Sequence, residues 1–402
     1  MTSPAGRWHA LVLVCLAELL AMALWFGVSS VAPRVSAEWN LSASGVAWLT
    51  MSVQFGFVAG TLLSAALNLA DIIRVRYLFA LSAFLGAAAN AALALGSDGI
   101  VSAVILRFLT GMFLAGVYPP GMKLLATWFR AGRGMALGAL VGALTLGKAS
   151  PYLVNWIGSE SWRTNVLIAS ASAFLGGALV LLFGHEGPFA PARARFDPAQ
   201  ITKILRNRGV RLANFGYFGH MWELYAMWTW LPLMLRASFA ESGDAPALAE
   251  IGSFLVIGAG AIGCFFAGVI ADRIGRTVVT SGAMIVSGGC CLTIGFLFGA
   301  APWLILLVAA IWGVTVVADS AQFSASVTEL GEPEYMGTAL TLQTSIGFLL
   351  TTVSIAVVPP LAARVGWEWA FAALAPGPIL GTIAMLRLRS LPEARKLAGG
   401  RG

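Results

Sequence analysis

The octapeptide Glu-Leu-Leu-Ala-Met-Ala-Leu-Trp at residues 18–25 returns as Glu-Leu-Tyr-Ala-Met-Trp-Thr-Trp at residues 223–230, with five of eight positions identical. The two copies lie 205 residues apart in a chain of 402 residues. On a helix, the Glu, Met and Trp at i, i+4 and i+7 share one face. The sequence therefore predicts a duplicated chain in which each half directs an acid, a thioether and an indole toward the seam between the halves.

Two further pairs of motifs repeat at a similar spacing. Asp71, which precedes two arginines, matches Asp272, which lies 201 residues later and also precedes two arginines. Trp162 matches Trp367, which lies 205 residues later. Matches at a nearly constant spacing support the internal duplication.

The composition indicates a membrane protein with many spans. Hydrophobic residues make up 58% of the chain and charged residues 11%, whereas soluble domains contain about 25% charged residues. A helix needs about 20 apolar residues to cross a bilayer. The segments that satisfy this requirement are 10–33, 43–66, 77–96, 99–122, 134–155, 164–184, 212–236, 247–271, 277–298, 303–327, 336–361 and 369–388. We therefore expect an all-α membrane protein with twelve transmembrane helices in two pseudo-symmetric six-helix bundles.

The expected domains are an N-terminal six-helix bundle at 1–184, a cytoplasmic linker at 185–211 and a C-terminal six-helix bundle at 212–402. The linker is the longest polar stretch and is rich in basic residues and proline. Its segment 201–208 is either a short amphipathic helix on the anionic membrane surface or a solvated connection.

The net charge of +7 reflects topology rather than binding to nucleic acid. If the N-terminus is cytoplasmic, nineteen of the 25 lysines and arginines fall on the cytoplasmic side, which is the positive-inside pattern. With twelve spans, both termini are then cytoplasmic. The compact chain without targeting extensions favours the cytoplasmic (inner) membrane, so the lipid bilayer is an expected partner and nucleic acid is not.

The nonapeptide Gly-Val-Ile-Ala-Asp-Arg-Ile-Gly-Arg at residues 268–276 resembles the signature loop between the second and third helices of each half in the major facilitator superfamily. Residues 67–76 form a degraded copy, and residues 107–111 and 115–119 also resemble that superfamily. The resemblance implies two bundles that rock about a central site for a small-molecule substrate. A functional monomer without a cofactor is expected.

The resemblance also implies a cytoplasmic gate formed by charged residues of the two loops, namely Asp71, Asp272, Arg273 and Arg276. Loop anchoring by positive charge is the alternative interpretation. The fifth span departs from the antiporter signature, because residues 147–151 contain Lys148 and have Ser150, not glycine, directly before Pro151. This departure disfavours a multidrug antiporter.

Five ionisable residues fall within the predicted spans: Glu18, Arg107, Lys148, Glu223 and Asp319. An ionised side chain at mid-membrane costs about 2.5–3.5 kcal/mol on insertion scales, so we expect these groups to face a cavity or one another. Glu18 and Glu223 are the expected proton-coupling residues. His220 lies one turn before Glu223 and titrates near neutrality, which indicates a relay or a helix-packing hydrogen bond. Arg107 is the expected partner of Glu18, in a proton switch or a structural ion pair.

Lys148 is the expected contact for an anionic substrate, with Arg107 as a second cation. Thr145, Lys148, Tyr152 and Asn155 form one polar stripe on the fifth span. Asp319 and Gln322 form a corresponding stripe on the tenth span and are also expected to bind substrate. In the alternative interpretation, Asp319 only neutralises Lys148.

Trp25 and Trp230 share the face of the repeated glutamates and are therefore expected to line the substrate site. The alternative for each tryptophan is a place in the interfacial aromatic belt. Residues 258–263 match the dinucleotide pattern GxGxxG but lie within an apolar span and follow no strand. Close helix packing explains them. The four cysteines lack the spacing of a metal site, and no catalytic cluster indicates an enzyme.

Together these features favour a secondary active transporter of a small solute, preferably an organic or inorganic anion. Transport is expected to proceed by alternating access and to be coupled to protons. Proton-driven efflux of cationic or lipophilic drugs is a first alternative, which the acids and tryptophans favour. A membrane sensor that retains the fold but does not transport is a second alternative.

Overall fold

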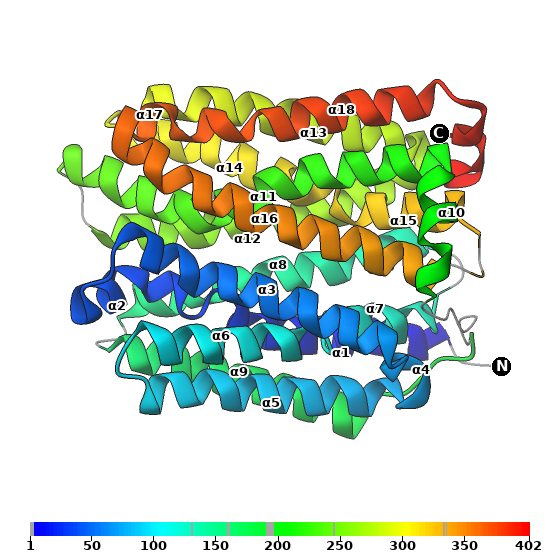
Figure 1. The fold of residues 1–402 in the computed structure, drawn as a ribbon, viewed down its shortest axis with the longest axis horizontal. Coiled ribbons are helices and arrows are strands. Elements are labelled where there is room, and N and C mark those ends of the chain that lie inside the picture. Colours follow the sequence, from blue (N-terminus) through cyan, green and yellow to red (C-terminus); the bar gives the residue numbers. More distant parts are fainter. Residues whose placement is uncertain are drawn as a thin grey trace. The chain divides into compact units, whose positions relative to one another are not determined.

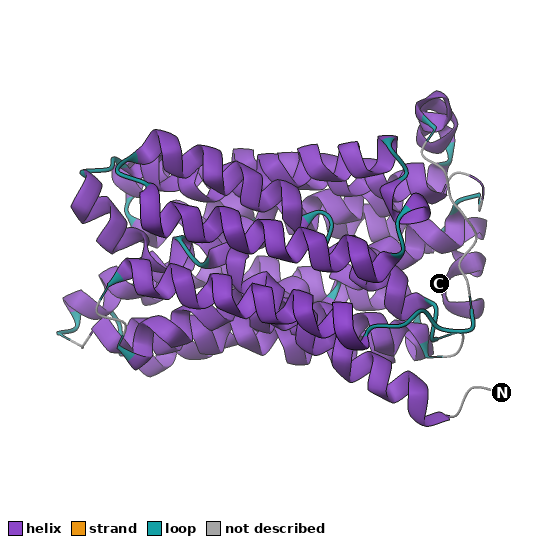
Figure 2. Ribbon diagram, turned by 90° about the horizontal axis from the view of Figure 1, so that it is seen from below, coloured by secondary structure: helices purple, strands orange, loops and turns teal. Residues whose placement is uncertain are grey.

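A computed structural model describes residues 4–129, 132–158, 161–189, 197–243, 246–332, 334 and 336–402. All regular secondary structure within these ranges is helical (Figure 2). The chain divides into two compact units, of which the first ends at Arg193 and the second begins at Ala194.

The first unit contains six long helical spans, the fourth of which is broken (Figure 1). Its helices are α1 (Pro4–Phe26), η1 (Ser29–Val31), α2 (Ala32–Trp39), α3 (Ala43–Ala66), α4 (Leu69–Ile72), α5 (Val75–Gly96), α6 (Ile100–Leu114), α7 (Tyr118–Ala126), α8 (Arg133–Ile157) and α9 (Trp162–Phe183). The break in the fourth span precedes Pro119 and Pro120, which have no backbone N–H to continue the helical hydrogen bonds.

The second unit repeats this order and also has a broken fourth span, with Asp319 between its two helices. Its helices are η2 (Pro198–Gln200), α10 (Ile201–Arg206), α11 (Arg208–Glu241), α12 (Pro246–Ile274), α13 (Arg276–Thr293), η3 (Ile294–Leu297), α14 (Pro302–Ala318), α15 (Ser320–Leu330), α16 (Met336–Val365), α17 (Trp367–Ala370), η5 (Phe371–Leu374), α18 (Pro376–Arg389) and η6 (Pro392–Gly399).

Eleven helical spans within the described residues are long and apolar enough to cross a membrane. The remaining expected span is α11, which has 34 residues and packs against α12, α16 and α18. Its acidic, basic and imidazole side chains lower its hydropathy, although most of its middle is buried within the second unit. The structure therefore has the expected all-α fold of twelve spans in two six-helix bundles.

The same close helix contact occurs in both units and supports their pseudo-symmetry. Gly111 of α6 lies against the carbonyl oxygen of Val53 on α3. Gly313 of α14 lies in the same way against the carbonyl oxygen of Val256 on α12. In both places a Cβ atom would overlap the facing backbone, so only glycine permits this approach. The matched pairs are 202 and 203 residues apart.

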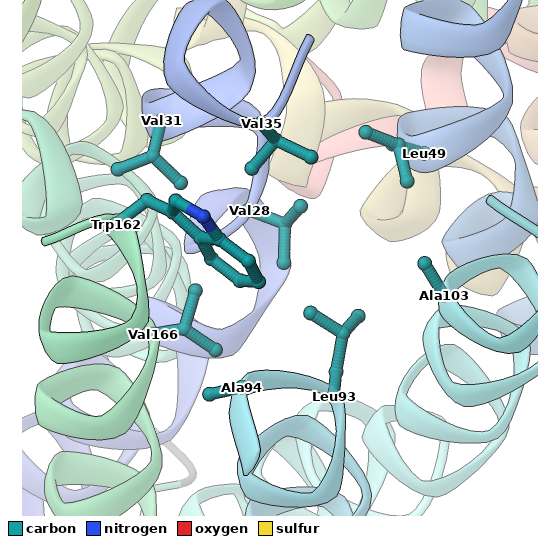
Figure 3. Close-up of a cluster of buried hydrophobic side chains, with 9 residues drawn as sticks. All are labelled: Val28, Val31, Val35, Leu49, Leu93, Ala94, Ala103, Trp162 and Val166. Carbon is teal, nitrogen blue, oxygen red and sulfur yellow. The ribbon is translucent and has the colours of Figure 1, made fainter. Parts of the chain in front are cut away.

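A hydrophobic cluster closes one end of the first unit (Figure 3). It gathers side chains from the α1–α2 connection, α2, α3, α5, α6 and α9, and consists of Val28, Val31, Val35, Leu49, Leu93, Ala94, Ala103, Trp162 and Val166. Because all nine are buried, the cluster fixes the chain where α1 ends and η1 begins. The candidate site described below uses that same stretch of chain.

The two described pieces of the expected linker attach to different units. On one side, the backbone N–H of Phe189 donates to the carbonyl of Thr127 at 3.0 Å, within the first unit. On the other side, the backbone N–H of Asp197 donates to Oγ1 of Thr338 at 2.8 Å, within the second unit. The short helix α10 follows and buries Ile204.

Candidate functional site

Lys148 lies buried in the first unit with its ammonium group over an aromatic ring. Its Nζ atom is 4.0 Å from the ring centroid of Trp25, and only 1% of the residue is exposed. The indole also packs against Phe57 of α3, at a centroid distance of 5.0 Å. A cation over an indole face gains about 2 kcal/mol or more when both groups are desolvated. Helices α1, α3 and α8 therefore meet at Trp25.

The other residues of the α8 stripe lie along the same stretch of chain. Tyr152 is buried, one turn beyond Lys148. The Nδ2 atom of Asn155 donates to the carbonyl oxygen of Ser30 at 3.3 Å. Thr145 bonds only to the Val141 carbonyl of its own helix, at 2.8 Å. The stripe thus faces the end of α1 and the beginning of η1.

Glu18 is fully buried, and neither of its carboxyl oxygens has a hydrogen-bond partner among the described residues. It interacts electrostatically with Lys148. A Cβ atom on Gly121 would lie 2.8 Å from its Oε2 atom, so the carboxyl group packs directly against α7. Glu18 therefore lies beside the break in the fourth span of the first unit.

Arg107 does not form the expected pair with Glu18. Its guanidinium donates to the carbonyl of Leu49 at 3.1 Å and to that of Leu24 at 2.8 Å. It also donates to the carbonyl of Trp25 and to Oδ1 of Asn90. Leu24 lies six residues after Glu18, about 9 Å along the helix at 1.5 Å per residue. Arg107 therefore binds the buried backbone carbonyls at the C-terminal end of α1.

Glu223 occupies the position of Glu18 in the second unit but accepts three side-chain hydrogen bonds. Its Oε1 accepts from Nε1 of Trp312 at 2.6 Å and from Sγ of Cys291 at 3.0 Å. Its Oε2 accepts from Oγ of Ser287 at 2.9 Å. The donors come from α13 and α14, so this carboxyl group points into the core of its own bundle.

His220 pairs with Asp319 rather than with Glu223. Its Nδ1 atom lies 2.8 Å from Oδ1 of Asp319, and both side chains are buried. Its Nε2 atom has no hydrogen-bond partner within the described part of the chain. Because Asp319 lies where α14 gives way to α15, the pair marks the break in the fourth span of the second unit. His220 therefore contacts a residue at this break, and its expected relay to Glu223 stays a prediction.

The expected gate residues of the second unit form a cluster around Arg276. The Nε and Nη2 atoms of this arginine donate to the two carboxylate oxygens of Glu329, at 2.8 and 2.6 Å. Its Nη1 donates to Oε1 of Gln322 at 2.7 Å, and Asp272 lies 3.6 Å from Nη2. Gln322, which we expected to bind substrate, is therefore held by the gate cluster. Arg273 is exposed.

Two further residues that we expected at the site are Asp71 and Trp230. The side chain of Asp71 lies outside the part of the structure that is described. Trp230 donates from Nε1 to the carbonyl of Ile355 at 2.9 Å, which joins α11 to α16 inside the second unit.

Several polar residues at these sites are not among the sequence-predicted candidates, because those candidates were chosen around the ionisable residues within the predicted spans. Trp312, Ser287 and Cys291 are neutral and give no charge signal. Glu329 lies two residues beyond the predicted tenth span, which ends at residue 327, and so is not among the charges within the spans. A search for every uncharged hydrogen-bonding side chain near the middle of a span would have found Trp312 and Ser287.

The described residues contain no group of three or more His, Cys, Asp and Glu side chains placed to hold a metal ion. The cysteines there carry no disulfide bond, and Cys264 and Cys291 instead donate to a carbonyl and a carboxyl oxygen. The chemistry of the two units therefore rests on buried acids, buried cations and hydrogen-bonding side chains.

Comparison with known proteins identifies the family. The chain is 25% identical to a hexuronate transporter of Escherichia coli, strains K12 and O157:H7, over 94% of this chain and 93% of that protein. It is 29% identical to a probable actinorhodin transporter of Streptomyces coelicolor over 48% of this chain and 34% of that protein. The sequence profile of the Major Facilitator Superfamily matches residues 14–355. The chain therefore belongs to the major facilitator superfamily, a family of membrane transporters and not of enzymes.

Proposed function

We propose that this chain is a proton-coupled secondary transporter of a small organic anion, acting by alternating access as a monomer in the cytoplasmic membrane with both termini cytoplasmic. The buried ammonium group of Lys148 against Trp25 carries the proposal. A lysine at this depth is costly unless negative charge offsets it. Glu18 supplies one such charge nearby, and a carboxylate on the substrate supplies a second in the proposed site.

The nature of the relatives supports this substrate class. A hexuronate is a sugar that carries a carboxylate, and the hexuronate transporter aligns with nearly the whole of this chain. In the proposed site, the substrate carboxylate approaches Lys148, and Trp25 and Tyr152 enclose it. Arg107 stabilises the site indirectly, because it fixes the carbonyls of Leu24 and Trp25.

We further propose that protons bind at the buried acids of both units. Glu18 lies near Lys148, so protonation of this carboxyl would change the field that an anionic substrate meets. In the second unit, Glu223 and the His220–Asp319 pair offer further protonation sites. Arg276, Asp272, Arg273 and Asp71 retain the proposed gate role.

Uptake of radiolabelled glucuronate into proteoliposomes tests the anion assignment. Lys148→Ala should lower saturable uptake at least about tenfold, because one charge-assisted contact contributes about 1.5–3 kcal/mol, and Lys148→Arg should retain part of it. Thr145→Val is the matched control, because this hydroxyl bonds only within its own helix. Wild-type uptake that Lys148→Ala leaves unchanged would refute the assignment.

The same vesicles test proton coupling. An inward proton gradient should stimulate wild-type uptake, and Glu18→Gln or Glu223→Gln should weaken the stimulation. If uptake is indifferent to the gradient in all three proteins, coupling to protons is wrong although the anion assignment stands.

Outward transport of lipophilic compounds is the second candidate. The second unit contains an aromatic group in which Tyr225 lies 5.4 Å from Trp228 and 5.2 Å from Phe348, measured between ring centroids. The partial similarity to a probable actinorhodin transporter also favours it. This function predicts drug-stimulated proton flux that survives Lys148→Ala.

A further inference from the structure

Gln54 is a buried amide that the proposed function has not used. It is the twelfth of the 24 residues of α3, and none of its surface is exposed. Neither Oε1 nor Nε2 has a hydrogen-bond partner among the described residues. Since buried polar groups in native proteins are nearly always paired, a fully buried amide without a partner needs an explanation.

The position of Gln54 on α3 directs it toward α1. Thr50, Gln54 and Phe57 follow the helical spacing i, i+4 and i+7 and therefore share one face. The first and last of them contact the end of α1 and the segment after it. Oγ1 of Thr50 lies 2.8 Å from Oγ of Ser29, and the ring of Phe57 packs on Trp25. Gln54 lies between these two residues on the same face of α3, which is the face turned toward the stretch from Trp25 to Ser29.

Helix α8 borders this stretch from another direction and brings its own unsatisfied oxygen. Asn155 donates from Nδ2 to Ser30, but its Oδ1 has no hydrogen-bond partner within the described ranges. Lys148, on the same stripe, places its ammonium over Trp25. The end of α1 is thus flanked by a cation, an amide with both ends unsatisfied and a carbonyl oxygen that can accept.

The chemistry of these groups defines a ligand. An amide offers two N–H donors and a carbonyl acceptor, and Asn155 adds another acceptor. A hydroxyl group both donates and accepts, so neighbouring hydroxyls on one molecule match this set, whereas an alkyl chain leaves it unsatisfied. We propose that Gln54 binds hydroxyl groups of the transported anion, with Oδ1 of Asn155 as a second contact. The preferred substrate is then a polyhydroxylated carboxylate, an inference that rests on the proposed anion transport.

The test compares two monocarboxylates that differ in their hydroxyl groups. Binding of gluconate and of hexanoate to the purified protein in detergent is measured by calorimetry, and competition by each anion against glucuronate uptake is measured in proteoliposomes. Wild type should prefer gluconate. Gln54→Met, which keeps the length of the side chain, should reduce this preference about tenfold or more by weakening gluconate alone.

Ser52→Ala on the same helix is the control, because the Ser52 hydroxyl donates to the Leu49 carbonyl of its own helix. If Gln54→Met does not fold, Gln54→Leu takes its place, because it is also uncharged and loses the amide donors and acceptor. If Gln54→Met leaves the ratio of gluconate affinity to hexanoate affinity unchanged, Gln54 does not bind the hydroxyl groups. The same conclusion follows if both anions bind equally more weakly. Neither outcome contradicts anion transport. Failure of the wild type to bind either anion or glucuronate would overturn both proposals.

Discussion

Glu18 and Glu223 occupy the same position of a repeated octapeptide, yet their surroundings differ completely. Glu18 has no hydrogen-bond partner among the described residues and packs against Gly121. Glu223 accepts hydrogen bonds from three side chains. Both acids are fully buried, so depth in the bundle does not explain the difference. The partners on the neighbouring helices do.

One donor to Glu223 has no equivalent in the first unit. At the spacing of 202 residues that Gly111 and Gly313 give the fourth span, Trp312 corresponds to Thr110. The hydroxyl of Thr110 donates to the carbonyl of Leu106 on its own helix. Duplication thus preserved the position of the acid, while divergence of the fourth span changed this partner.

The largest expected effect comes from removing each acid. Glu223→Leu leaves the buried donors of Trp312 and Cys291 without this acceptor, whereas Ser287 keeps the Met284 carbonyl. It should destabilise the protein by about 3 kcal/mol, because each unsatisfied donor costs about 1–3 kcal/mol. Glu18→Leu removes a carboxyl group that has no hydrogen-bond partner among the described residues but also removes the charge near Lys148, so a smaller loss of stability is expected. Thermal unfolding in detergent, followed by tryptophan fluorescence, measures both. Equal destabilisation by the two substitutions would show that the difference in partners has no energetic consequence.

A smaller effect is expected where Arg107 and Trp312 bind the first helix of their units. Arg107→Lys keeps the charge but lacks the planar fork that reaches several carbonyls at once, so at least one carbonyl loses its donor. A loss of about 2 kcal/mol of stability is expected. Trp312→Phe removes a single N–H donor and keeps an aromatic ring against Phe371, so about 1 kcal/mol should be lost. The reverse order in the same unfolding assay would contradict this comparison.

Much of the fold could be predicted from the sequence, because membrane spans follow from apolar length and the duplication from repeated motifs. The twelve spans, the family and the stripe of Lys148 and Tyr152 were all visible there. The interruptions of the fourth spans were not predicted, although Pro119 and Pro120 indicate the first of them.

The partners of the ionisable residues could not be predicted, because they depend on how neighbouring helices rotate against one another. Arg107 was expected to bind Glu18, but backbone carbonyls at a helix end compete for the same guanidinium. Gln322 was assigned to the substrate because it follows Asp319 by one turn, but Arg276 lies close enough to bind it. A neutral amide such as Gln54 carries no charge to attract attention in a sequence.

The starts of α9 and α17, at Trp162 and Trp367, allow a second comparison between the two units, for which a smaller effect is expected. In the first unit, Glu38 of α2 binds Arg163 at 2.8 Å and accepts from Nε1 of Trp162 at 2.6 Å. In the second unit, the residue after the corresponding Trp367 is Glu368, an exposed acid. Among the described residues, the ion pair at this position is therefore found in the first unit, and Glu368 forms none.

The ion pair at Glu38 should give the contact between α2 and α9 a pH dependence that the corresponding position at Glu368 lacks. Hydrogen bonds from Arg163, with a further one from Trp162, hold the pKa of Glu38 below its ordinary value, which is about 4.3. A carboxyl whose pKa is lowered by folding contributes stability that is fully present above about pH 4.3 and is lost as the pH falls through the folded value. Thermal unfolding between pH 6 and pH 3 should therefore depend less on pH in Glu38→Gln than in wild type, whereas Glu368→Gln should follow wild type. The effect should be the smallest of the series, because exposed ion pairs are screened by water and salt. Parallel curves for wild type and Glu38→Gln would mean that the α2–α9 contact does not depend on this charge.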